Sequence, residues 1–153
     1  MTDGDRKRVL FVCIGNACRS QMAEAFARHH GSDVLIPASA GLSPASRVAG
    51  DTIRAMEEKN FDIRDHFPKA IRNLGRARFD LIVNMSGRPV SGEAGCKVVE
   101  WEVPDPIGME YSEHCEIRDA IERQVMELVA ALRRDKQAVR FRGQGSGSLP
   151  MGG

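Results

Sequence analysis

The feature that most restricts the fold is a nearly continuous apolar run, residues 8–13 (RVLFVC), followed closely by a segment of helical periodicity. An apolar run without alternation is typical of a strand buried on both faces of a parallel sheet. Residues 20–30 place apolar side chains at helical spacing, and Gly31 can end that helix. The turn between them, residues 13–20, is therefore expected at the carboxyl edge of the sheet, where ligands bind in such folds.

The rest of the chain repeats this alternation of short apolar runs and helical patterns. The expected strands lie at residues 8–13, 33–38, 80–85 and 97–101, and the expected helices at residues 20–30, 47–59, 67–74 and from an N-cap at Ser112 onward. Right-handed crossovers between such strands build a layered domain. The predicted fold class is α/β, a single three-layer domain with a four-stranded parallel sheet, helices on both faces and a ligand-binding loop after the first strand.

Length and composition indicate one domain and restrict the class of partner. The chain has 153 residues, 42% of them hydrophobic, and a net charge of +1, so no strong field attracts nucleic acid or a membrane surface. No segment reaches the roughly 20 apolar residues that a membrane span needs. We expect a flexible N-terminus at residues 1–7, a folded domain at residues 8–142 and a disordered glycine-rich tail at residues 143–153.

The cysteines bear on the cellular compartment. The chain has four of them, Cys13, Cys18, Cys96 and Cys115, which could in principle form two disulfides. A chain with a full core and no export signal favours reduced thiols instead. The expected localisation is therefore the cytoplasm.

The turn at residues 13–20 (CIGNACRS) has the composition of an anion site. Successive backbone N–H groups in such a loop can surround an anion, and the positive end of the following helix points at the same place. Gly15 and Asn16 tolerate the unusual dihedrals that a tight loop requires, and Arg19 offers a planar fork to two oxygens. The same positive environment favours the thiolate form of Cys13, and Ser20 could donate a hydrogen bond to it. The alternative is a buried cysteine at a strand end, followed by ordinary helix-start residues.

This segment, VLFVCIGNACRS at residues 9–20, resembles the signature of the low-molecular-weight protein tyrosine phosphatases and the related thioredoxin-coupled arsenate reductases. Residues 39–41 (SAG), residues 80–83 (DLIV) and the pair at residues 105–106 (DP) also match that family. The resemblance implies that residues 8–142 form the catalytic domain and that residues 13–20 form its phosphate-binding loop. The implied anion-binding residues are Ile14, Gly15, Asn16, Ala17, Cys18 and Ser20.

The same resemblance assigns catalytic roles to Cys13 as the nucleophile, Arg19 as the group that holds the anion, and Asp105 as the general acid. Taken alone, the Pro-Asp-Pro sequence around Asp105 is also what an ordinary stiff turn looks like. Its position after the fourth strand places it at the same sheet edge as Cys13. The implied mechanism is a double displacement through a phosphocysteine, with Asp105 first protonating the leaving oxygen and then activating water.

Two branches of the family remain open on the sequence. Gln21 after the loop resembles the reductases, and Ile107 stands where phosphotyrosine-preferring members carry an aromatic residue. Against the reductases, Ser86 occupies the position of their resolving cysteine, and serine cannot form a disulfide. Cys96 could be a substitute redox partner or a buried thiol at a strand start. Cys18 could form a reversible disulfide with Cys13, as the resemblance suggests, or be a packed small side chain.

From these observations we expect a phosphate monoester hydrolase acting on a phosphorylated protein or a small phosphate ester. The alternative is an arsenate reductase that uses Cys13, a further thiol (Cys96 or Cys18) and thioredoxin as its partner. An alternative from another class is an oxyanion-binding or redox-sensing module without turnover. No cofactor and no metal are expected, because the histidines are scattered along the chain.

Overall fold

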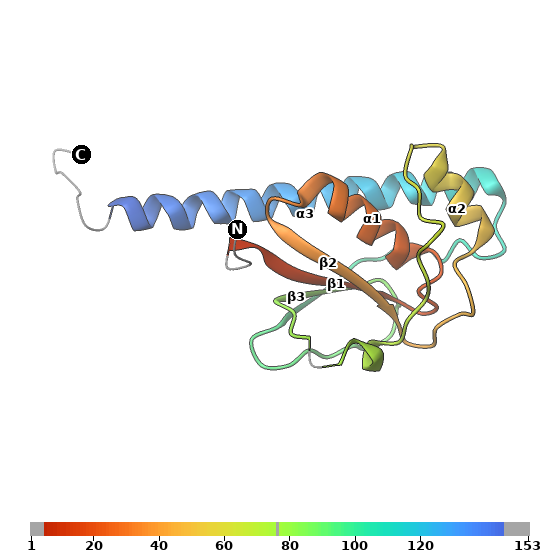
Figure 1. The fold of residues 1–153 in the computed structure, drawn as a ribbon, viewed down its shortest axis with the longest axis horizontal. Coiled ribbons are helices and arrows are strands. Elements are labelled where there is room, and N and C mark those ends of the chain that lie inside the picture. Colours follow the sequence, from red (N-terminus) through yellow and green to blue (C-terminus); the bar gives the residue numbers. More distant parts are fainter. Residues whose placement is uncertain (1–4, 76, 146–153) are drawn as a thin grey trace.

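The computed structural model describes residues 5–75 and 77–145 (Figure 1). Its elements are, in chain order, β1 (Lys7–Cys13), α1 (Arg19–Gly31), β2 (Leu35–Gly41), α2 (Gly50–Glu57), the 3-10 helix η2 (Ile71–Leu74), β3 (Leu81–Asn84), β4 (Lys97–Glu100) and α3 (Tyr111–Gly145). The strands form one parallel sheet in the order β2-β1-β3-β4. The predicted α/β domain with a four-stranded parallel sheet is confirmed. The chain turns from one side of β1 to the other, so the carboxyl end of β1 lies at the topological switch point.

The burial of β1 on both faces explains the unbroken apolar run. Val9 and Phe11 face a large core cluster with α1, α2 and α3, whereas Leu10 and Val12 face a smaller cluster on the opposite side. Within the described residues, η2 is the helix that covers this second face, and loop segments complete the cover. Among the described residues the two helical layers are therefore unequal: α1, α2 and α3 lie on one face and the 3-10 turn η2 on the other.

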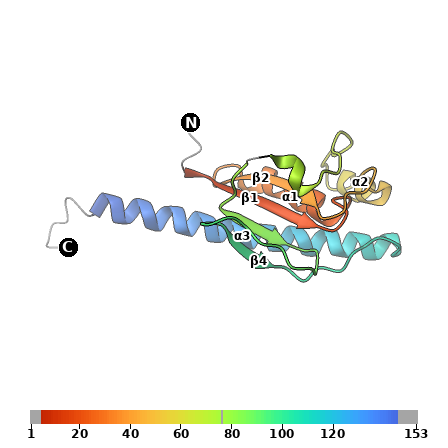
Figure 2. The ribbon, with the colours of Figure 1, turned by 90° about the horizontal axis from the view of Figure 1, so that it is seen from below.

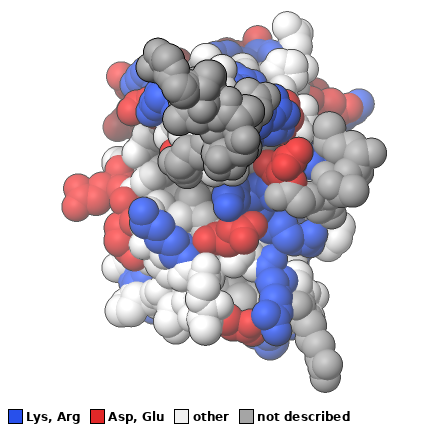
Figure 3. All heavy atoms as spheres, turned by 90° about the vertical axis from the view of Figure 1, so that its left-hand side faces the viewer, with Lys and Arg blue, Asp and Glu red and all other residues white. Residues whose placement is uncertain are grey.

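The helix α3 runs the length of the domain, and its C-terminal end projects past the sheet (Figures 1 and 2). It begins at Tyr111, so Ser112 is not its N-cap; instead the Glu113 carboxylate accepts a hydrogen bond from the backbone N–H of Glu110. The helix continues through Gly145, into the range predicted as a tail. The remaining tail residues, 146–153, and residues 1–4 of the predicted N-terminal segment lie outside the described residues. Seen from the projecting end, basic and acidic side chains are interleaved (Figure 3).

The segment around residue 70 differs most from the sequence prediction. A helix was expected over residues 67–74, but the structure has a 3-10 turn only at Ile71–Leu74. The preceding residues stay extended because their backbone groups bond to other elements: the Lys69 carbonyl accepts from the Gly41 N–H, and the Phe67 carbonyl accepts from the Gln21 side chain. Tertiary hydrogen bonds thus replace the local ones that a helix would make. None of the helices in residues 5–75 and 77–145 has the length and apolar character to cross a bilayer.

Candidate active site

The loop after β1 turns its carbonyl groups outward. The carbonyl oxygens of Cys13, Ile14, Gly15 and Ala17 accept hydrogen bonds from backbone N–H groups at residues 42–49. Within the described part of the chain, no backbone N–H from residue 14 to residue 19 donates to another protein group. Because the carbonyls are fixed outward, these amides are left to face the concave side of the loop. This is the arrangement that binds a tetrahedral anion.

Asn16 fixes the shape of the loop. It is fully buried and has a φ of +50°, a left-handed conformation that asparagine adopts more readily than most residues. Its side-chain oxygen accepts from the backbone N–H of Lys69 at 3.0 Å, and its Nδ2 donates to Ser20 Oγ at 2.7 Å. The Gln21 amide donates to both oxygens of Asn16. The start of α1 and the segment at Lys69 therefore hold one turn of the loop together.

The Cys13 thiol ends β1 at the bottom of this loop. Its sulfur lies 2.9 Å from Ser20 Oγ, and both side chains are buried. Since the Ser20 oxygen already accepts a hydrogen from Asn16, the serine's own hydrogen is free to point at the sulfur. The serine hydroxyl therefore orients the Cys13 sulfur at the bottom of the loop.

Arg19 brings a buried positive charge to the same place. Its Nη1 donates to the carbonyl oxygens of Met85 at 2.6 Å and Val103 at 2.9 Å, groups that follow β3 and β4. Its Nη2 lies 3.6 Å from Asp105 Oδ2. The two carbonyls partly compensate the buried charge and fix the plane of the guanidinium. One edge of the fork is thus anchored in the protein, while the other faces the loop that carries Asp105.

Asp105 is half-exposed, with 49% of its side chain accessible. Its Oδ1 accepts from the backbone N–H of Ile107, which orients the carboxyl group, and the Ile107 side chain is exposed. The structure therefore brings together Cys13, Arg19 and Asp105 at the carboxyl edge of the sheet. Their positions after the first and fourth strands predict this arrangement.

The other thiols differ in their access to Cys13. Cys18 lies in the same loop, and burial raises its pKa to about 11, opposed by a hydrogen bond from Thr52. Cys96 precedes β4, at the opposite end of the sheet. Its neighbour Lys97 is level with Val9 of β1, and four residues of strand, about 13 Å, separate that level from Cys13.

A disulfide requires Cα atoms within about 7 Å, so Cys96 cannot pair with Cys13 in this conformation. Ser86, two residues after the end of β3, is buried and donates to the side chain of Asn84. All four cysteines are free thiols. Of the two redox partners considered from the sequence, the structure therefore leaves only Cys18 near the nucleophile.

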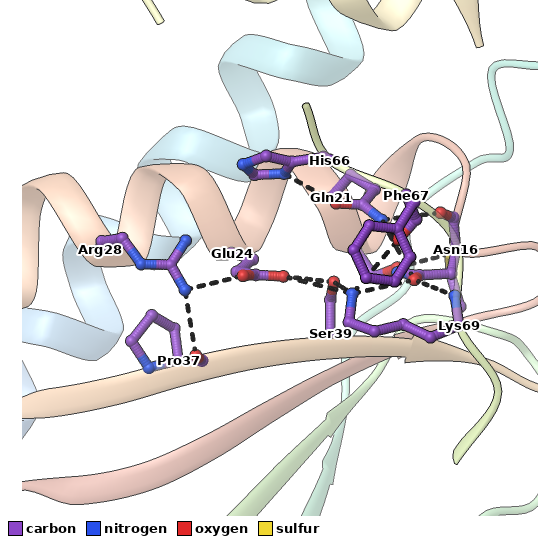
Figure 4. A network of polar contacts seen from close by, with 11 residues as sticks. Asn16, Gln21, Glu24, Arg28, Pro37, Ser39, His66, Phe67 and Lys69 are labelled. Atoms are coloured by element: carbon purple, nitrogen blue, oxygen red, sulfur yellow. Dashed lines mark hydrogen bonds and ion pairs between the residues drawn. The ribbon is translucent and has the colours of Figure 1, made fainter. Parts of the chain in front are cut away.

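Several contacts beside the loop follow from no sequence pattern. Glu24, Ser39, His66 and Lys69 join Gln21 in a polar network beside the loop (Figure 4). The sequence pointed to Gln21 and to the motif that contains Ser39, but not to the contacts they make. Among residues 5–75 and 77–145, no group of three or more His, Cys, Asp or Glu side chains could hold a metal ion.

An amide-lined loop around a buried thiol, with an arginine anchored beside it, defines the class of α/β proteins built to bind a tetrahedral oxyanion next to a cysteine. The model of the family "Low molecular weight phosphotyrosine protein phosphatase" matches residues 8–138. The chain belongs to this family and is an enzyme of it.

Arsenate reductases are among the relatives of known name, and a phosphatase is among the solved structures that share the fold. The glutaredoxin arsenate reductase of Synechocystis sp. is 32% identical over 130 residues, which cover 82% of this chain and 98% of that protein. The solved structure of an arsenate reductase in the phosphate-binding state is 30% identical, with a TM-score of 0.72, and covers 82% of this chain and 98% of its own. The YwlE arginine phosphatase of Geobacillus stearothermophilus shares the fold at 22% identity, with a TM-score of 0.73 over 86% of this chain and 96% of its own.

Proposed function

We propose that this chain is an arsenate reductase in which Cys13 forms the covalent adduct with the oxyanion. The observation that carries the proposal is the free Cys13 thiol inside an amide-lined loop, in a chain that matches arsenate reductases over nearly their whole length. Arsenate is tetrahedral and anionic, so it suits the loop amides and Arg19. The relatives thus favour reduction, although Ser86 in place of a resolving cysteine points toward hydrolysis.

The reduction requires a second thiol. The Cys13 thiolate would displace one oxygen of arsenate as water, forming a sulfur–arsenic bond. A second thiolate would then attack the Cys13 sulfur, both electrons of that bond would pass to arsenic, and arsenite would leave. The products are arsenite and a disulfide on Cys13, which a further thiol reduces.

We infer that the second thiol comes from another molecule. Cys96 is out of reach, and the raised pKa of Cys18 keeps that thiol protonated near neutral pH. Thioredoxin, glutaredoxin or a small thiol in a reducing cytoplasm could each supply it. One relative's name includes glutaredoxin, which makes this class of donor the first to test.

The second candidate is hydrolysis of phosphate monoesters, and a specific contact favours it. Asp105 Oδ2 lies 3.6 Å from Arg19 Nη2, so a carboxyl group is present where a leaving oxygen would need a proton. Cys13 would attack phosphorus, Asp105 would protonate the leaving oxygen, and water would release phosphate from the phosphocysteine. A phosphorylated protein or a small phosphate ester would be the substrate.

The two functions are separated by paired assays on one preparation. Arsenate-dependent NADPH oxidation is measured with the thioredoxin system and with glutaredoxin plus glutathione, and hydrolysis is measured with para-nitrophenyl phosphate. We expect Cys13→Ser to abolish every activity. Asp105→Asn should lower hydrolysis by about 10²- to 10⁴-fold, the usual contribution of a general acid, and leave arsenate reduction less affected.

Hydrolysis without arsenate reduction by any thiol donor would overturn the reductase proposal in favour of the hydrolase. Binding of inorganic phosphate without either activity would instead support the oxyanion-binding module. Reduction that persists in Cys13→Ser would refute the assignment of the nucleophile.

A further inference from the structure

Lys69 extends its ammonium group into a cluster of oxygen atoms beside the phosphate-binding loop (Figure 4). Its Nζ lies 3.5 Å from Asn16 Oδ1, 3.5 Å from Ser39 Oγ and 3.4 Å from the Phe67 carbonyl oxygen. The nearest carboxylate oxygen is Glu24 Oε1, at 4.0 Å. One cation therefore contacts the loop, β2 and α1 together, with 23% of its side chain exposed.

The carboxylate that faces Lys69 is itself held on both sides. Glu24 is buried in α1; its Oε1 accepts a hydrogen bond from Ser39, and its Oε2 pairs with Arg28 at 2.7 Å. Arg28 is exposed and lies on the side of Glu24 away from the loop (Figure 4). Glu24 thus has two cationic neighbours, and only Lys69 also contacts the loop.

A continuous series of contacts leads from this ion pair to the nucleophile. Lys69 Nζ contacts Asn16 Oδ1, Asn16 Nδ2 donates to Ser20 Oγ at 2.7 Å, and Ser20 Oγ lies 2.9 Å from the Cys13 sulfur. The Lys69 backbone N–H also binds Asn16 Oδ1, at 3.0 Å. Lys69 thus contacts the Asn16 amide through both its backbone and its side chain, beside Gln21, whose Nε2 donates to the same oxygen at 3.1 Å.

We propose that Lys69 is a positioning residue for the reaction, whose ammonium, paired with Glu24, fixes the Asn16 side chain and thereby the loop amides and the Ser20–Cys13 contact. The inference rests on the proposed use of Cys13 as the nucleophile, and it holds whether the substrate is arsenate or a phosphate ester. Burial lowers the pKa of Lys69, and the Glu24 carboxylate offsets part of that effect. The ammonium charge of Lys69 is therefore partly desolvated, which costs free energy. A lysine that served only surface solubility would not need to be in such a place.

The test measures the reactivity of the Cys13 thiol directly, without turnover. Alkylation of Cys13 by iodoacetamide is followed by peptide mass spectrometry, with and without inorganic phosphate. We expect Lys69→Met to slow alkylation at pH 7 and to raise the phosphate concentration for half-protection about tenfold, as for loss of one hydrogen bond to a charged group. Glu24→Gln should act in the same direction, and Lys69→Arg should restore part of the protection.

The matched control is Arg28→Met, which removes a cation from the same carboxylate without touching the loop. We expect it to change both readouts less than twofold. If Lys69→Met and Glu24→Gln behave like this control, or alter only the urea midpoint of unfolding, the positioning role is wrong while the proposed function stands. Wild-type Cys13 that phosphate does not protect would instead overturn the proposed function, and the positioning role with it.

Discussion

Replacement of Gly41 by alanine adds a methyl group directly beneath the loop that follows β1. A Cβ at this position would lie 2.7 Å from the Ile14 carbonyl oxygen and 2.9 Å from the Asn16 backbone nitrogen. Real Cβ atoms essentially never come this close, and both neighbours are backbone atoms that cannot rotate away. The loop must therefore move by a few tenths of an ångström, and the Asn16 N–H, one of the proposed anion donors, moves with it.

This movement should lower both the turnover and the stability of the protein. Removal of one donor from an oxyanion site costs about 10²- to 10³-fold in turnover, and a displaced donor should approach the lower value. We therefore expect Gly41→Ala to lose about 10²-fold in kcat/KM for arsenate reduction or for hydrolysis. Crowding of a packed core should also lower the free energy of unfolding by about 1–3 kcal/mol.

Steady-state kinetics and urea denaturation of the same preparations measure these two quantities. Gly50→Ala is the control, since nothing lies within 4 Å of a Cβ at the start of α2 and alanine is the better helix former. Near-wild-type turnover in Gly41→Ala would show that the Asn16 N–H does not hold the anion.

Three further outcomes are expected. Cys96→Ser should leave arsenate reduction and hydrolysis unchanged, because this thiol lies at the far end of the sheet; loss of reduction alone would show that Cys96 reaches the site. Gly31→Ala would place a Cβ 2.6 Å from Val129 Cγ2, so it should cost about 1–3 kcal/mol in urea denaturation, and Val129→Ala should recover part of that. Burial lowers the pKa of His114 below its ordinary 6.5, so the unfolded chain binds a proton that the fold excludes; stability should fall below about pH 6.5, by at most about 1.4 kcal/mol per pH unit, and His114→Gln should flatten this slope.

The arrangement of thiols explains why the family alone does not decide between reduction and hydrolysis. Both proposed reactions would begin with the same step, attack by Cys13 on a tetrahedral centre held by Arg19 and the loop amides. They differ in what attacks next, a thiol or water. The raised pKa of Cys18 and the remote position of Cys96 bear on that second step, and together they favour a thiol from outside the chain if arsenate is reduced.

The sequence by itself determined the first strand, the loop and the helix that follows, since burial on both faces and helical periodicity are local patterns. It also placed Asp105 at the correct edge, because the carboxyl ends of parallel strands lie together. The family resemblance assigned the roles of Cys13, Arg19 and Asp105 in that arrangement.

Only the tertiary structure decided which distant residues support the loop. The contact between Lys69 and Asn16 joins residues 53 positions apart, and no periodicity encodes such a pair. The same contacts kept the segment before η2 extended, where local preference predicted a helix. The register of the strands also decided that Cys96 is remote from Cys13, because the distance between two thiols depends on where their strands begin and end in the sheet.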